Sequence, residues 1–122
     1  MAVLIDALQA LHKEMTALLI HDVQREYVRE QVQELARNKS LSHPVGLDVK
    51  SIEDFFELRD KAGLLCGLNV RLFFGIFAPK KYIILLGIIH KQNNGSTPEG
   101  DKLRMRRRWR SHYRSLNQVD TD

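Results

Sequence analysis

Hydrophobic residues are concentrated in one run, Leu68 to Lys91, which is the most apolar and β-branched part of the chain. The run is interrupted once, by Ala78-Pro79-Lys80-Lys81, where proline presets φ for a tight turn and two lysines keep the tip in water. The stretches on either side, residues 70–77 and 82–90, are therefore predicted to pair antiparallel as a β-hairpin. Both faces of each strand are apolar, which is typical of the centre of a sheet covered on both sides.

Pairing of Phe77 with Tyr82 across the turn would decide which side chains of the hairpin share a face, because side chains alternate along a strand. One face would then carry Arg71, Phe73, Gly75, Phe77, Tyr82, Ile84, Leu86, Ile88 and His90. The other face would carry only apolar side chains suited to packing on helices, namely Val70, Leu72, Phe74, Ile76, Ile83, Leu85 and Ile89. Arg71 and His90 would be diagonal neighbours within reach of one ligand, and a register slip of one residue would separate them.

Helical periodicity appears twice before the hairpin. From Asp6 onward the apolar positions are Leu8, Leu11, Met15 and Leu18, and in the second stretch they are Val23, Tyr27, Val28, Val32 and Leu35. Ile20-His21-Asp22 is the predicted joint, since Asp22 can cap the second helix. We expect these helices to pack as a pair over one face of the sheet. The short apolar segment Ala2 to Ile5 fits either an edge strand or the start of a helix.

The segments around the hairpin contain the chain's turn signals. Residues 38–48 are predicted to form a loop from their Ser, Asn, Pro and Gly content. The following stretch is ambiguous: Ser51 and Asp54 have capping-box spacing for a helix that would end at Gly63, whereas residues 55–59 equally fit a strand. Residues 92–100 are a second loop, after which a helix is expected from about Thr97 to Leu116.

The predicted C-terminal helix is amphipathic. Its apolar side carries Met105, Trp109, His112, Tyr113 and Leu116, and its basic side carries Arg104, Arg107, Arg108 and Arg114. We expect Met105, Trp109 and Leu116 to cover the Arg71/His90 face of the sheet, with Arg104, Arg107 and Arg108 in solvent. Residues 117–122 are predicted to be a frayed tail.

Length and charge add further limits. The 122 residues suit one domain, residues 1–122, that can bury a single core. Cys66 is the only cysteine, so a disulfide framework or cysteine metal site is excluded and a reducing compartment fits. Asp6, Lys13 and Glu14 interrupt the apolar N-terminal segment, which argues against a membrane helix or a signal peptide and favours a cytoplasmic protein.

The net charge of +4 is unevenly distributed. Residues 102–114 hold seven of the nineteen Lys and Arg residues and no acid, so the rest of the chain has a balance of 12 − 15 = −3. A mildly acidic body with one concentrated basic segment indicates a localised site for a polyanion.

Three groups of residues carry a resemblance to a known family. They are Phe56-Glu57-Leu58-Arg59, then Val70-Arg71-Leu72-Phe73-Phe74, then the run from Ile89-His90-Lys91 through Thr97-Pro98 into the basic helix. Their order and spacing, over roughly Val49 to Tyr113, resemble the RelE/ParE superfamily of type II toxin–antitoxin toxins, and within it the phage-derived, HigB-like branch.

The resemblance implies an α+β fold in which two N-terminal helices pack on a small, mainly antiparallel four-stranded sheet followed by a basic C-terminal helix. It favours the strand over the helix at residues 55–59. It also implies a ribosome-dependent endoribonuclease that cleaves mRNA and inhibits translation. Its expected partners are the ribosome, mRNA and a cognate antitoxin, for which a small helix-turn-helix protein is expected, and no membrane. Cleavage of this kind needs no metal or cofactor, because the ribose 2′-hydroxyl attacks the adjacent phosphate.

The catalytic residues implied by the match are Arg71, Arg59, His90 and Lys91. Arginine grips phosphate with a planar fork, and histidine titrates near neutral pH and can act as general acid or base. Arg71 would stabilise phosphate unless it forms an ion pair, Arg59 would be a second phosphate contact or a solvated strand end, and His90 would be catalytic or structural. RNA or ribosome contacts are expected from Lys102, Arg104, Arg106, Arg107, Arg108 and Arg110. His112 and Tyr113 suit proton transfer, base stacking or core packing.

Two departures from the family leave alternatives open. No clear pair of general base and general acid is present, and residues 60–69 exceed the short turn usual between the corresponding strands. A ParE-like toxin that poisons DNA gyrase, and an inactive phage-derived module that binds nucleic acid or a partner, therefore remain alternative functions.

Overall fold

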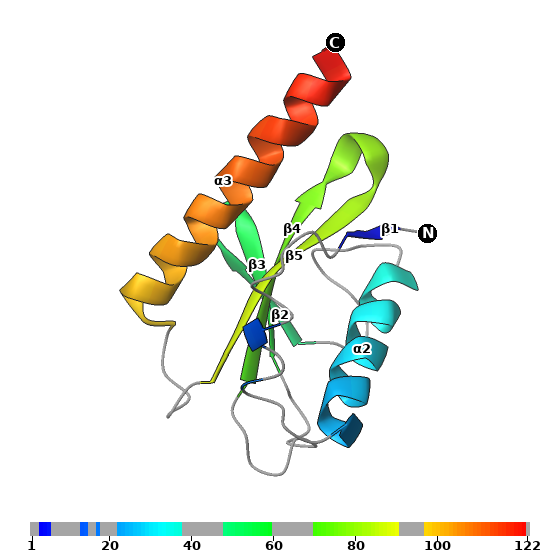
Figure 1. Cartoon of the computed structure of the whole chain (residues 1–122), viewed down its shortest axis with the longest axis vertical. Helices are drawn as coiled ribbons and strands as arrows, with labels where there is room; N and C mark the ends of the chain where they lie inside the picture. The colour runs from blue at the N-terminus through cyan, green and yellow to red at the C-terminus, as the bar shows by residue number, and fades with distance from the viewer. Residues whose placement is uncertain are drawn as a thin grey trace.

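The computed structural model describes residues 3–5, 13–14, 17, 22–37, 48–59, 70–90 and 97–121, and it has an α+β architecture (Figure 1). The elements in chain order are β1 (Val3–Ile5), α2 (Asp22–Arg37), β2 (Asp48–Ile52), β3 (Phe55–Arg59), β4 (Val70–Phe77), the 3₁₀ turn η1 (Ala78–Lys80), β5 (Tyr82–His90) and α3 (Glu99–Thr121).

The sheet has five strands in the order β1-β5-β4-β3-β2. Strands β2 to β5 form the expected four-stranded antiparallel part, and β1 adds a fifth strand parallel to β5. The N-terminal apolar segment is thus an edge strand, and the strand at residues 55–59 is confirmed. The alternative of a helix that begins near Ser51 is wrong, because residues 48–52 pair with β3 as strand β2.

The predicted hairpin is confirmed, with β4 and β5 antiparallel and Phe77 opposite Tyr82. The predicted faces hold only as far as Phe74, because the register shifts between Phe73, which faces Gly87, and Phe74, which faces Leu85. A bulge of this kind moves all later side chains of β5 to the other face. Arg71 therefore lies opposite Ile89 and not beside His90, which pairs with Val70. The predicted diagonal contact between Arg71 and His90 is wrong for this reason.

Two hydrophobic clusters cover the two faces of the sheet, and Figure 1 shows α2 and α3 on either side of it. The cluster shared with α2 contains Val28, Val32, Leu35, Ala36, Leu58, Val70, Leu72, Phe74, Ile83, Leu85 and Ile88. The cluster shared with α3 contains Ile52, Phe55, Phe73, Phe77, Ile84, Leu86, Ile89, Met105 and Trp109, with Leu116 packed against it. The predicted cover of this second face by the C-terminal helix is confirmed.

The helices differ from the prediction at their ends. Helix α2 includes Asp22 as its first residue, and one N-terminal helix is assigned within the described ranges. The first predicted helix, from Asp6, lies mostly outside the described residues. Its described residues are 13, 14 and 17, and these are helical. Helix α3 continues to Thr121, so the predicted frayed tail is wrong for residues 117–121.

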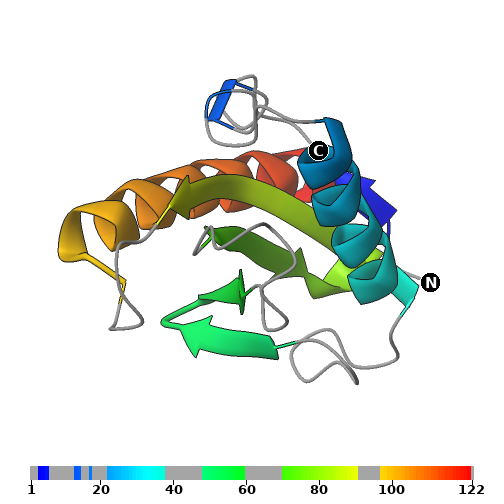
Figure 2. The ribbon, with the colours of Figure 1, turned by 90° about the horizontal axis from the view of Figure 1, so that it is seen from below.

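None of the helices in the described ranges is long and apolar enough to span a membrane. Helix α3 runs lengthwise beside the long β4–β5 hairpin, as Figure 2 shows from below.

Candidate functional site

A fully buried carboxylate, that of Glu57, lies on the α3 face of the sheet. Glu57 is on β3 opposite Phe73, so Arg71 on β4 is its diagonal neighbour, and Glu57 Oε1 lies 2.8 Å from Arg71 Nε. Arg71 is 5% exposed and its Nη1 also donates to the carbonyl of Val70. The Nε–H does not point along a hydrogen bond, so the attraction is mainly electrostatic. Two roles were open for Arg71, phosphate binding and an ion pair. The structure supplies the ion-pair partner, Glu57, and the pair is buried and not at the surface.

Two further groups approach the same carboxylate. Arg59 Nε lies 3.7 Å from Glu57 Oε1, and the Arg59 side chain keeps 25% exposure. The hydroxyl of buried Thr97, just before α3, donates to Glu57 Oε2 at 3.0 Å. Glu57 therefore joins two strands to the beginning of the C-terminal helix. Since one acid meets two arginines, the cluster keeps a net charge of +1.

The structure does not bring the four predicted catalytic residues together. Arg59 and Arg71 share Glu57, whereas His90 is exposed at the end of β5. Strand alternation after the bulge directs His90 to the face opposite Arg71. Lys91 lies outside the described residues.

Most of the predicted RNA-binding residues of α3 have an acidic partner. Lys102 pairs with Glu99 and Arg104 pairs with Asp101, both one turn apart at 3.3 Å. Such exposed pairs are weak and easily exchanged for a phosphate. Arg106 and Arg108 have partners that are distant in the sequence, Glu53 and Glu14 respectively.

Arg108 is bound to the bulge of β5, so its predicted placement in solvent is wrong. Its Nη1 donates to the carbonyl of Leu86 at 2.8 Å, and its Nη2 lies 2.9 Å from Glu14 Oε1. The other oxygen of Glu14 accepts the N–H of Ile88 at 3.1 Å. The edge groups of β5 next to the bulge are therefore satisfied by a pair of side chains, which is how the bulge is held.

Arg107, Arg110 and Arg114 are exposed and have no hydrogen bond or ion pair among the residues that the structure describes. Their spacing of i, i+3 and i+7 places them on one face of α3, so they form an arginine stripe. A stripe of arginines that bind no neighbouring acid is suited to an anionic partner.

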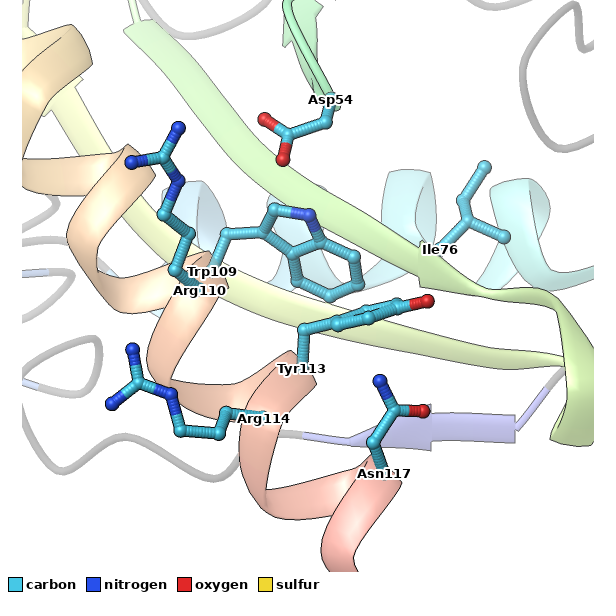
Figure 3. Close-up of a pocket in the computed structure, with 7 residues that line it drawn as sticks. All are labelled: Asp54, Ile76, Trp109, Arg110, Tyr113, Arg114 and Asn117. Carbon is cyan, nitrogen blue, oxygen red and sulfur yellow. The ribbon is translucent and has the colours of Figure 1, made fainter. Parts of the chain in front are cut away.

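A cavity of about 720 Å³ opens beside this stripe. Figure 3 shows its lining, which is Asp54, Ile76, Trp109, Arg110, Tyr113, Arg114 and Asn117. Tyr113 and Asn117 extend from α3 toward the end of β4, and Asp54 comes from the β2–β3 turn on the other side. We call this cavity the α3 pocket.

Aromatic rings form one wall of the α3 pocket. Tyr113 is 45% exposed, and its ring meets Trp109 and Phe77 edge to face with centroids 5.6 Å apart in both pairs. Trp109 approaches β4 closely because Gly75 has no side chain, and a Cβ there would lie 2.2 Å from Trp109 Cε3. The buried tryptophan thus supports an exposed tyrosine, an arrangement suited to stacking of a nucleobase.

The pocket was only partly foreseeable. Tyr113 and Arg110 were candidates from the sequence, although core packing was the other option for Tyr113. Asp54 was missed as a site residue, because its position after Ser51 suggested a helix cap. It has no hydrogen bond or ion pair among the described residues, so its carboxylate is available to a ligand.

Of the residues that the structure describes, no three His, Cys, Asp or Glu side chains are grouped as metal ligands would be. What the α3 pocket offers is an exposed aromatic face, two arginines at the rim and one carboxylate. The aromatic face can stack a base, and the arginines can bind the phosphates next to it. The carboxylate can accept a proton or a hydrogen bond.

His112 does not line the α3 pocket, and burial lowers its pKa below the ordinary value of 6.5. The folded state therefore favours neutral His112, and its contribution to stability is complete above about pH 6.5 and lost as the pH falls below it. We expect the melting temperature to decrease less from about pH 7.5 to about pH 5 in His112→Gln than in the wild type. Thermal melts across this range measure the difference, and equal decreases would show that other groups determine it.

No protein-family model matches this chain, and no curated protein matches its sequence.

Proposed function

We propose that the protein is a RelE-like toxin of a type II toxin–antitoxin system that acts in the cytoplasm as a metal-independent endoribonuclease on translated mRNA. The observation that carries the proposal is the α3 pocket, where Tyr113, Arg110 and Arg114 place an aromatic face beside two arginines that form no hydrogen bond or ion pair among the described residues. The four antiparallel strands and the basic final helix are features that the resemblance implies. An antitoxin that neutralises the toxin would cover this surface.

The pocket suggests roles for its own residues that differ from those first expected of Arg71 and His90. A base of the mRNA stacks on Tyr113 while Arg110 and Arg114 bind the backbone phosphates on either side. Asp54 lies across the pocket and accepts the proton of the ribose 2′-hydroxyl as that oxygen attacks the phosphate. The bond from phosphorus to the 5′-oxygen of the next nucleotide breaks, which leaves a 2′,3′-cyclic phosphate and a 5′-hydroxyl whose oxygen takes its proton from solvent. The arginines stabilise the additional negative charge that develops on the phosphate oxygens.

Pocket variants test this proposal. We expect Tyr113→Ala to weaken binding of single-stranded RNA by about tenfold, since stacking on an aromatic residue contributes about 1–3 kcal/mol per base. Arg110→Ala should also weaken binding and reduce the salt dependence of log K by about 0.7 for each phosphate that the variant no longer binds. The chain offers Arg107→Ala as the matched control, because Arg107 lies in the same stripe but does not line the pocket. Equal losses of affinity for Arg107→Ala and Arg110→Ala would indicate diffuse charge and not a pocket.

Inducible expression tests the activity itself. Wild-type expression is expected to arrest growth and to produce new 5′ ends in cellular mRNA, and both effects should be weaker for Tyr113→Ala. DNA damage with intact mRNA would replace the proposal with a ParE-like gyrase poison. Unchanged growth and mRNA would favour an inactive module that binds nucleic acid or a partner.

A further inference from the structure

The β2–β3 turn has an unusual backbone conformation at Glu53. Ile52 pairs with Phe55, so Glu53 and Asp54 form a two-residue hairpin loop. Glu53 has φ of 57°, a left-handed conformation that glycine adopts easily and that strains the backbone of a glutamate. A residue that keeps such a conformation is held there by other contacts, and these can serve a function.

The contact that holds Glu53 comes from helix α3. Arg106 Nε donates to Glu53 Oε2 at 2.6 Å, and Arg106 Nη2 donates to Glu53 Oε1, so the guanidinium grips both carboxylate oxygens. The same pairing lowers the pKa of Glu53 and raises that of Arg106. Glu53 is 44% exposed and Arg106 is 23% exposed, and ion pairs with this exposure add little to global stability.

The position of this pair relates it to the α3 pocket. Asp54 follows Glu53 directly, and Arg110 follows Arg106 by one turn of α3 on the same flank of the helix. Figure 3 shows Asp54 and Arg110 entering the pocket from two separate elements, the turn and the helix. Glu53 and Arg106 are therefore the contact next to the pocket that joins the element carrying its carboxylate to the element carrying its arginines.

We propose that Glu53 and Arg106 are positioning residues that clamp the β2–β3 turn to α3 and so set the spacing between Asp54 and Arg110 for an RNA nucleotide. This proposal rests on the proposed function for its ligand, single-stranded RNA. A bidentate arginine–carboxylate pair suits the task because its planar geometry fixes direction as well as distance. Glutamate at a position that favours glycine is then explained by its side chain, which glycine lacks.

The test variant is Glu53→Gly, which relieves the backbone and removes the clamp. We expect its melting temperature to equal or exceed that of the wild type, while its affinity for a short single-stranded RNA of mixed sequence falls at least about fivefold. Trp109 is the only tryptophan of the chain and lines the pocket, so its fluorescence reports both RNA binding and pocket opening. Quenching of Trp109 by acrylamide should increase in Glu53→Gly without RNA.

The control removes an exposed ion pair elsewhere on the protein. Arg29 pairs with Glu26 at 3.5 Å on α2, so Arg29→Gln loses one arginine and one exposed pair far from the pocket. It should change neither RNA affinity nor quenching by more than about twofold. Arg106→Gln should behave like Glu53→Gly in both measurements, and the exchanged pair Glu53→Arg with Arg106→Glu should recover part of the affinity.

The outcomes separate the two proposals. If wild-type protein binds RNA and Glu53→Gly binds it equally well with unchanged quenching, the clamp proposal is wrong and the pocket proposal stands. If the wild type does not bind RNA, the proposed function fails, and quenching of Trp109 still decides whether the pair holds the pocket. A lower melting temperature in Glu53→Gly than in Arg29→Gln would assign the pair a structural role in place of a positioning one.

Discussion

Replacing Glu57 with alanine is expected to lower the free energy of unfolding by about 3–5 kcal/mol, because removal of one member of a buried ion pair leaves the other charge without compensation. Glu57 is fully buried and Arg71 is 5% exposed, with 2.8 Å between Oε1 and Nε. The variant also takes the acceptor from the Thr97 hydroxyl, which ties the start of α3 to the sheet. Chemical denaturation followed by circular dichroism measures the loss of stability.

Substitutions of Arg71 test whether this residue stabilises the fold or binds phosphate. Arg71→Ala should lower the melting temperature in the same way as Glu57→Ala, since it leaves a buried carboxylate with Arg59 and Thr97 as its remaining partners among the described residues. The double variant Glu57→Leu with Arg71→Met should recover much of the stability, because well-packed apolar groups can replace a buried pair with little cost. An Arg71→Ala protein that melts like the wild type but no longer cleaves RNA would restore the phosphate role expected from the resemblance.

The strands of the hairpin were predictable because the information that specifies them is local. A continuous apolar run, a proline and two lysines define β4, the turn and β5, and the observed pairs begin with Phe77 opposite Tyr82 as expected. The bulge was not predictable in this way. Gly87 lies opposite Phe73 at the bulge, and a Cβ there would lie 2.5 Å from Met105 Cε and 2.6 Å from Arg108 Nη1. These contacts come from a helix that follows in the chain, so alternation alone placed His90 on the wrong face.

The candidate site shows the same division between local and tertiary information. Charge density identified α3 as the basic surface, but the partners of its arginines are set by tertiary structure. Glu53 and Glu14 pair with Arg106 and Arg108, whereas Arg110 forms no hydrogen bond or ion pair among the described residues and has only a longer-range attraction to Glu53. Asp54 lines the pocket because residues 48–59 form a hairpin, whereas the sequence also allowed a capped helix there.

Gly75→Ala is the second substitution from which we expect a large effect. Its Cβ would lie 2.2 Å from Cε3 and 2.4 Å from Cζ3 of Trp109, which is 4% exposed and cannot move aside without moving α3. Overpacking of this kind costs about 1–3 kcal/mol or more, and here it acts at the contact between β4 and the helix. We expect a lower melting temperature and a red shift of Trp109 fluorescence as the ring becomes more exposed.

The matched control is Gly87→Ala on the neighbouring strand, where the nearest atoms are Met105 Cε at 2.5 Å and Arg108 Nη1 at 2.6 Å. Both atoms end flexible side chains, so the cost should be smaller than at Gly75, even though moving Arg108 Nη1 breaks its hydrogen bond to the Leu86 carbonyl. The Trp109 spectrum should not change. Since Trp109 also supports Tyr113 in the α3 pocket, Gly75→Ala should weaken RNA binding more than Gly87→Ala at temperatures where both proteins are folded. Equal destabilisation by the two substitutions would mean that α3 can shift on the sheet, and that Trp109 is not the rigid support on which the pocket depends.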